Sequence, residues 1–125
     1  ESRGLGDVYK RQVSGNEAAL QTVFDNLVEN GLRYAASYIR MELTGEEEGG
    51  YLLTVENDGA PIPQPTLNVL FQKFYKGADG NFGLGLYIAK KIVQFHKGDI
   101  WASNWADGVR FQLLLRREDR MAGRC

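Results

Sequence analysis

The sequence has few of the residues that mark disulfide-rich, membrane-spanning or secreted proteins. Its one cysteine, Cys125, is the last residue, so no disulfide can form within the chain, which fits a reducing compartment. No apolar run approaches the ~20 residues that a membrane-spanning helix needs. The N-terminus also lacks the apolar segment of a signal peptide. We therefore expect a cytoplasmic domain that makes no membrane contact of its own, although its parent protein could be anchored in a membrane.

Basic charge is scarce where a nucleic acid would need it. The formal net charge is −1, and residues 13–115 carry eight basic and twelve acidic side chains. A surface that follows a phosphate backbone needs clustered lysine and arginine, so we expect no nucleic-acid binding. A length of 125 residues with 43% hydrophobic content fits one domain with a single core.

The order of helical and alternating patterns predicts an α+β two-layer sandwich. Residues 1–12 have no sustained period and read as a leader, tag or linker, residues 13–115 as the domain, and residues 116–125 as a charged tail. An apolar stripe predicts a helix from Asn16 onward. The other expected elements are strands at 38–44, 51–56, 99–103 and 109–115, a short helix at 67–74, and a helix at 86–96 with Gly98 as its C-cap.

A glycine-rich stretch, GNFGLGL at residues 80–86, opens directly into a predicted helix. Exposed N–H groups and the positive end of the helix dipole make such a junction a natural anion site. The stretch is not a P-loop, because no Lys-Ser/Thr pair follows the glycines, and no strand precedes it as in a dinucleotide fold. By itself it could equally be a connector without a ligand.

Two asparagines, Asn26 and Asn30, lie four residues apart on one face of the first predicted helix, and Arg33 follows three residues later. Asparagine prefers caps and turns to helix interiors. A carboxamide oxygen can serve as a Mg²⁺ ligand whose other ligands are phosphate oxygens and water. The alternative is that these are exposed polar positions on a surface helix.

Four stretches, in this order, resemble the motifs of the ATP-binding catalytic domain of bacterial sensor histidine kinases, within the GHKL ATPase superfamily. NLVENGLRYA resembles the N box, VENDGAPIP the first glycine box, LFQKFYKG the F box, and GNFGLGLYIAKKIVQFHKGDI the second glycine box. The resemblance implies a mixed sheet covered on one face by about three helices. It also implies ATP and Mg²⁺ as cofactors, transfer of the γ-phosphate to a histidine on a separate dimerisation domain, and a response regulator as an indirect partner.

The resemblance also implies roles for individual residues. Asn30 would be the Mg²⁺ ligand supported by Asn26, Arg33 would contact phosphate, and Tyr34 would pack on adenine. The remaining implied nucleotide contacts are Asn57, Gly59 and Ile62 at the base, Lys76 at the terminal phosphate, and Gly83, Leu84, Gly85 and Leu86 along the phosphates. Of these residues, Asn30, Arg33 and Lys76 would carry the catalysis.

The chain departs from the family pattern in the first glycine box and next to Asn30. Asn57 stands where an aspartate usually binds the adenine amine, and strand alternation places Asn57, not Asp58, on the apolar face with Leu53 and Val55. Pro61 replaces a common glycine. Gly31 replaces an alanine, which costs about 1 kcal/mol of helix stability.

Two other functions use the same motifs: a degenerate nucleotide-binding signalling module without kinase activity, and a stand-alone anti-sigma-factor serine kinase. The lone histidine, His96, reads as a helix-end residue and not as the phosphate acceptor. No stretch resembles the dimerisation domain that carries the acceptor histidine in this family. The sequence therefore predicts the catalytic half of a kinase, which would not phosphorylate itself alone.

Overall fold

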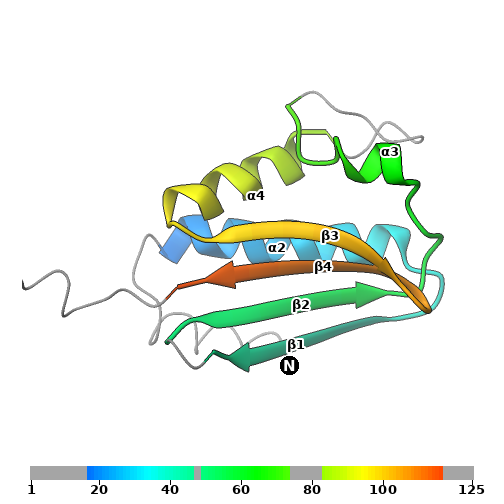
Figure 1. Ribbon diagram of the computed structural model, residues 1–125, viewed down its shortest axis with the longest axis horizontal. Coiled ribbons are helices and arrows are strands. Elements are labelled where there is room, and N and C mark those ends of the chain that lie inside the picture. Colours follow the sequence, from blue (N-terminus) through cyan, green and yellow to red (C-terminus); the bar gives the residue numbers. More distant parts are fainter. Residues whose placement is uncertain (1–16, 47–48, 74–82, 117–125) are drawn as a thin grey trace, which may run out of the picture.

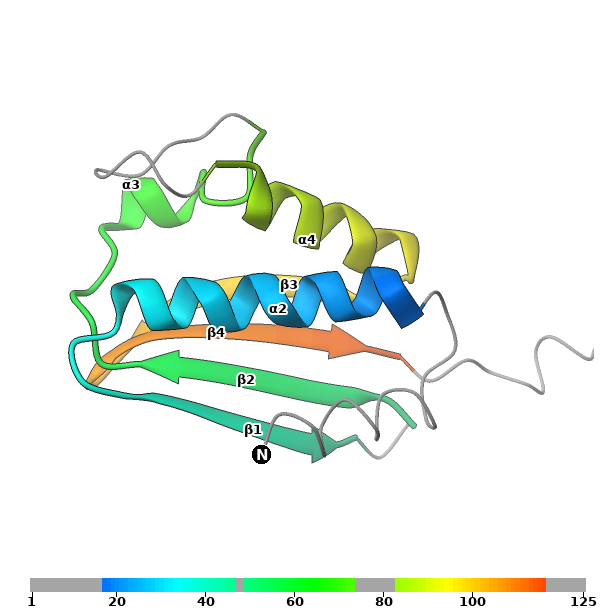
Figure 2. The same cartoon turned by 180° about the vertical axis from the view of Figure 1, so that it is seen from behind.

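The computed structural model describes residues 17–46, 49–73 and 83–116, and these form two layers (Figure 1). The helices α2 and α4 cover one face of a four-stranded sheet, and the short α3 lies beside them at one end (Figure 2). The elements in chain order are α2 (Glu17–Tyr34), β1 (Ile39–Gly45), β2 (Tyr51–Asn57), α3 (Gln64–Leu67), α4 (Gly83–Phe95), β3 (Asp99–Trp105) and β4 (Gly108–Leu115). The predicted α+β sandwich is confirmed.

The strand order is β1-β2-β4-β3, and each neighbouring pair is antiparallel. The mixed sheet implied by the family resemblance is therefore not seen among the described strands. The reason lies in the connections: β1–β2 and β3–β4 are hairpins, and the two hairpins meet through an antiparallel β2–β4 pair. The connection from β2 to β3 through α3 and α4 would permit a parallel pair, but β4 lies between these two strands in the sheet.

One hydrophobic core lies between the sheet and the two longer helices. Strand alternation places Leu53 and Val55 of β2 in it, 0% and 1% exposed, as predicted. The other core residues come from α2, α4, β3, β4 and the segment after α3: Leu20, Val23, Phe24, Leu27, Leu70, Leu86, Ala89, Val93, Ile100, Val109, Phe111, Leu113 and Leu115. Asn57 continues the core-facing side of β2 to its end.

The glycine inside α2 has a packing reason. A Cβ at Gly31 would lie 3.2 Å from Ile39 Cγ2 and 3.6 Å from Val55 Cγ1. The helix therefore lies close to β1 and β2 at this turn, and a side chain here would require Ile39 to shift by a few tenths of an ångström. This close approach offsets the helix propensity that glycine loses.

The helix ends differ from the predictions at two places. The left-handed residue after α4 is Lys97, with φ of 63°, and not Gly98. The N–H of Lys97 bonds to Gln94 O and that of Gly98 to Val93 O, which is the hydrogen-bond pattern of a Schellman motif. Gly98 is required sterically instead, because a Cβ there would lie 2.2 Å from Leu114 O.

The predicted helix at 67–74 is also shifted. The structure has a helix at Gln64–Leu67, with Pro63 at its N-cap and a proline in the first turn, followed by turns. Proline fits the first helical turn because its missing N–H has no partner there anyway. Pro63 and Pro65 therefore lie at the start of this helix.

The sheet face opposite the helices carries a polar cluster. Glu56, with its side chain 5% exposed, pairs with Arg40 and Arg110, and Arg110 Nε lies 2.6 Å from Glu56 Oε2. Both guanidinium groups lie over the ring of Trp105. A buried carboxylate is tolerated because two cations compensate it.

None of the described helices is long and apolar enough to cross a bilayer.

Candidate functional site

A small cavity of about 120 Å³ lies where the last turn of α2 meets the ends of β2 and β4 and the loop after β2. It has largely apolar walls and two carboxamides. Its lining residues are Asn30, Tyr34, Asn57, Ala60, Ile62, Val109 and Phe111. Ligand pockets commonly measure about 300–1,000 Å³, so this cavity suits one flat end of a larger ligand. Four of the predicted nucleotide residues, Asn30, Tyr34, Asn57 and Ile62, meet here.

Asn30 is 8% exposed and lines this cavity. Its side chain has no hydrogen-bond partner among the described residues. Buried polar groups normally find a partner in the protein or in bound water. The alternative interpretation, a solvated position on a surface helix, is therefore wrong for Asn30, and its carboxamide is available to a ligand in the cavity.

Asn26, one turn earlier on α2, is half-buried and donates a hydrogen bond from Nδ2 to Gly85 O at 2.9 Å. This bond holds the polar face of α2 against the first turn of α4. Arg33 lies in the last turn of α2 with an exposed side chain, and it does not line the cavity. The side of α2 that carries Asn26, which is predicted to face metal and phosphate, therefore borders the first turn of α4.

Asn57 is 2% exposed at the end of β2, and its Oδ1 accepts a hydrogen bond from Gly59 N at 2.8 Å. A Cβ at Gly59 would lie 2.1 Å from Tyr34 O and 2.8 Å from Asn57 Oδ1. Only glycine leaves space for this close approach of the loop to the end of α2. Gly59 therefore shapes the cavity by having no side chain.

Asp58 points away from the cavity, as strand alternation predicts, and organises the chain after α2. Its Oδ1 accepts hydrogen bonds from the backbone N–H groups of Ala36, Ser37 and Tyr38 at 3.0, 2.9 and 3.1 Å, and Oδ2 accepts one from Ser37 Oγ. The Ser37 hydroxyl and these N–H groups favour the ionised carboxylate and lower the pKa of Asp58 below its usual value.

The lowered pKa of Asp58 predicts an acid-dependent contribution to stability. A group with a depressed folded-state pKa stabilises the protein above its unfolded pKa, about 3.9, and loses this effect as the pH falls further. We expect wild type to be more stable than Asp58→Asn at pH 6, with the difference shrinking below about pH 4. Denaturant melts of both proteins from pH 7 to 3 measure it, and a difference independent of pH would contradict the assignment.

Asn104 in β3 is a positioning residue that the sequence did not reveal. Its side chain accepts from Ile62 N and donates to Ile62 O, both at 2.8 Å. This pair holds the loop after β2 against the β3–β4 hairpin, so that Ile62 faces the cavity. Asparagine is depleted in strands, and its presence in one was the signal available in the sequence.

The predicted phosphate residues at the start of α4 differ in exposure and packing. Leu84 is 47% exposed, whereas Leu86 is 2% exposed and belongs to the core, so only its backbone is near the helix start. A Cβ at Gly85 would meet only Asn26, at an ordinary 3.8 Å. Packing among the described residues therefore does not require glycine at 85, which fits a position that a phosphate approaches. Gly83 is the first residue of α4, and Lys76 lies outside the described residues.

No cluster of three histidine, cysteine, aspartate or glutamate side chains that could hold a metal occurs in the described part of the chain. A site built only from such residues is therefore absent there. Mg²⁺ bound together with phosphates needs few protein ligands, and the unpartnered Asn30 carboxamide fits this requirement. His96 is not a candidate ligand: its Nδ1 donates to Ile92 O at 2.8 Å in the last turn of α4, as expected for a helix-end histidine.

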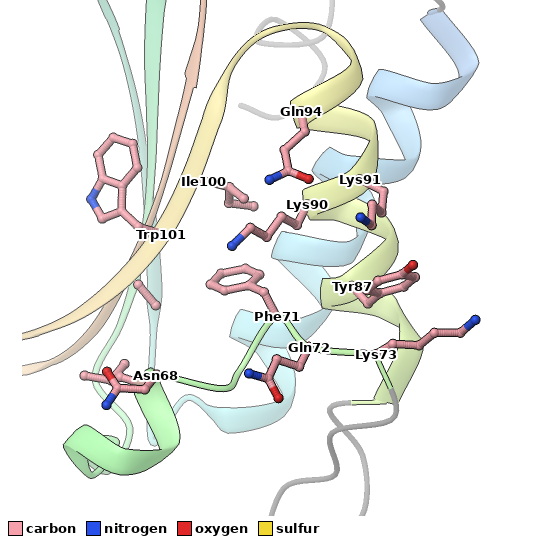
Figure 3. Close-up of a pocket in the computed structure, with 12 residues that line it drawn as sticks. Asn68, Phe71, Gln72, Lys73, Tyr87, Lys90, Lys91, Gln94, Ile100 and Trp101 are labelled. Atoms are coloured by element: carbon pink, nitrogen blue, oxygen red, sulfur yellow. The ribbon is translucent and has the colours of Figure 1, made fainter.

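A second cavity, of about 530 Å³, lies between α4, β3 and the segment after α3 (Figure 3). Lys90 points into it near Phe71, whereas Lys73 points away (Figure 3). The Lys90 ammonium lies 5.5 Å from the centre of the Phe71 ring. None of the residues predicted to bind nucleotide lines this cavity.

Comparison with known proteins agrees with this geometry. Residues 15–119 match the family of histidine kinase-, DNA gyrase B- and HSP90-like ATPases. The chain is 32% identical over 101 residues to the sensor histidine kinase CssS of Bacillus subtilis (strain 168), covering 81% of this chain and 22% of CssS. It is 34% identical over 123 residues to the sensor histidine kinase CusS of Escherichia coli (strain K12), covering 92% and 25%. The chain thus spans about a quarter of the length of these relatives.

Solved structures show the same fold. The catalytic domain of histidine kinase ThkA, in a nucleotide-free form, superposes with a TM-score of 0.72 at 29% identity, over 84% of this chain and 71% of ThkA's. The mycobacterial sensor histidine kinase MprB superposes with a TM-score of 0.76 at 22% identity, over 94% of each chain. The chain belongs to the histidine kinase-, DNA gyrase B- and HSP90-like ATPase family, and within it the chain is similar to the catalytic part of sensor histidine kinases.

Proposed function

We propose that this domain binds ATP with Mg²⁺ and presents the γ-phosphate to a histidine on a dimerisation domain of the same parent kinase, which passes the phosphoryl group to a response regulator. The observation that carries the proposal is the shared setting of Asn30 and Asn57. Both carboxamides line one cavity next to a helix start that Asn26 holds in place. The parent kinase would work in the cytoplasm, on a soluble part or on the inner side of a membrane-anchored sensor.

In this proposal the chain positions the nucleotide and neutralises its charge. The cavity takes the base, with Tyr34 against its ring and Asn57 at its edge. The first turn of α4 lies beside Asn26 and offers N–H groups to the phosphates. Asn30 would hold Mg²⁺, which would supply charge neutralisation at the phosphates. Arg33 and Lys76 contribute further positive charge.

No general base is needed from this domain, because the attacking imidazole is itself the nucleophile. Transfer of a phosphoryl group asks for little covalent chemistry, and positioning and charge stabilisation account for most of the rate. This division of labour explains why a domain without an acceptor histidine can still be the catalytic part of a kinase. Residues 13–115 would suffice for nucleotide binding, with residues 1–12 and 116–125 outside the domain.

The proposal is tested with nucleotide binding first and transfer second. Calorimetric titration of the chain with ATP, with and without Mg²⁺, should show binding that Mg²⁺ strengthens. Labelled phosphate should then reach the histidine of an added dimerisation domain. Binding without transfer would indicate a signalling module without kinase activity, and transfer to a serine of a protein substrate would indicate a serine kinase.

A substitution at Gly85 separates a ligand role from a packing role. Gly85→Ala should leave the melting temperature unchanged or slightly raised, because among the described residues the new methyl group meets only Asn26, at 3.8 Å, and alanine is the better helix former. ATP affinity should fall by about tenfold or more, since a Cβ keeps a phosphate from the backbone. Thermal melts and calorimetry of the same preparation measure both effects. Unchanged ATP affinity would remove Gly85 from the phosphate site.

A further inference from the structure

The orientation of the Asn57 carboxamide is determined by its backbone neighbour. Gly59 N donates a hydrogen bond at 2.8 Å, and only the oxygen of a carboxamide can accept it. Oδ1 must therefore face Gly59, and Nδ2 is turned away from it. Nδ2 has no hydrogen-bond partner among the described residues. Because Asn57 lines the small cavity, it can offer a ligand there the Nδ2 donor and the second lone pair of Oδ1.

Most other residues of the cavity wall have no side-chain group that could hydrogen-bond to the edge of a base, so this role falls to Asn57. Four of the lining residues, Ala60, Ile62, Val109 and Phe111, are apolar and contribute shape without hydrogen bonds. Asn30 also lines the cavity, and its carboxamide is the proposed metal ligand. The hydrogen bond that selects one purine base over another would therefore be formed chiefly by Asn57.

Purine bases differ in the group at position 6, which would face Asn57 and is either a hydrogen-bond donor or an acceptor. Adenine carries an amine, a donor, whereas hypoxanthine and guanine carry a carbonyl oxygen, an acceptor. An aspartate at position 57 could only accept, so it would select the amine. The Asn57 Nδ2 donates to a 6-oxo group, while its Oδ1 keeps one lone pair for a 6-amino group.

On this basis, and resting on the nucleotide binding proposed above, we infer that Asn57 is a specificity-determining residue that admits 6-oxo purine nucleotides alongside ATP. Inosine triphosphate is the matching probe, because it lacks the additional 2-amino group of guanosine triphosphate. The residue acts on the base alone, so the effect appears in nucleotide affinity and not in the chemistry of transfer.

Calorimetric titration with ATP and with inosine triphosphate, on wild type and on Asn57→Asp, tests the inference. In wild type the two dissociation constants should agree within about threefold, because each base finds a partner on the carboxamide. In Asn57→Asp the ratio should shift toward ATP by about tenfold or more, because an acceptor facing the 6-oxo group leaves both unsatisfied. Asp is the same size as Asn and can still accept from Gly59 N, so the fold should persist, and a thermal melt checks this.

Asn68→Asp is the matched control, because it makes the same chemical change at an exposed position outside the small cavity. It should leave the ratio unchanged. Wild type that binds ATP but rejects inosine triphosphate overturns this inference and leaves the proposed function intact. So does an Asn57→Asp ratio equal to that of wild type, or an equal shift in Asn68→Asp. Binding of neither nucleotide to wild type overturns both proposals.

Discussion

Replacing Asn30 by alanine is expected to abolish the strengthening of ATP binding by Mg²⁺ and to reduce phosphoryl transfer by at least about a hundredfold. Stabilisation of charge at a metal-bound phosphate contributes several kcal/mol, and each 1.36 kcal/mol is about tenfold in rate. The fold should be retained, because the Asn30 side chain has no hydrogen-bond partner among the described residues to leave unsatisfied. Alanine also favours the helix interior.

The measurement combines titration of the chain with ATP at zero and saturating Mg²⁺ with a transfer assay to the dimerisation domain. Asn68→Ala provides a control of the same residue type, since Asn68 is exposed and lies outside the small cavity. Transfer at the wild-type rate by Asn30→Ala would refute the ligand assignment. A variant that no longer melts cooperatively would instead show that Asn30 stabilises the fold.

Replacing Gly59 by alanine is expected to lower the stability of the fold strongly. The new Cβ would lie 2.1 Å from Tyr34 O and 3.0 Å from Tyr34 C, and backbone atoms cannot move aside as a side chain can. Overpacking typically costs about 1–3 kcal/mol and occasionally more. At the upper end this lowers the melting temperature by roughly 10 °C or more for a domain of this size. The cavity also loses its shape, so ATP affinity should fall as well.

Gly45→Ala is the control for this substitution, because a Cβ at Gly45 has no atom of the described residues within 4 Å. It should melt at or slightly above the wild-type temperature, since alanine loses less backbone entropy on folding. Thermal unfolding followed by circular dichroism compares the three proteins. If Gly59→Ala melts like Gly45→Ala, the close approach of the loop to α2 is not a constraint on this fold.

The site could be predicted from the sequence to the extent that it depends on local periodicity. Helical spacing placed Asn26 and Asn30 on one face of α2, and strand alternation separated Asn57 from Asp58. The function of Asp58 was not foreseen, because its partners are the N–H groups of a segment about twenty residues earlier. Which loop lies beside the end of β2 depends on how β1 follows α2 in space.

The sequence by itself determined the element types, the α+β class and the polar side of α2, because each follows from the spacing of residues close together in the chain. The tertiary structure decided the contacts that assemble the site. Asn26 meets Gly85 across 59 positions, and Asn104 meets Ile62 across 42. Such pairs depend on the strand order β1-β2-β4-β3 and on how closely the helices pack on the sheet. Neither the strand order nor the packing distance can be predicted from a local sequence pattern, because hydrogen bonds between distant segments form only once the core has brought them together.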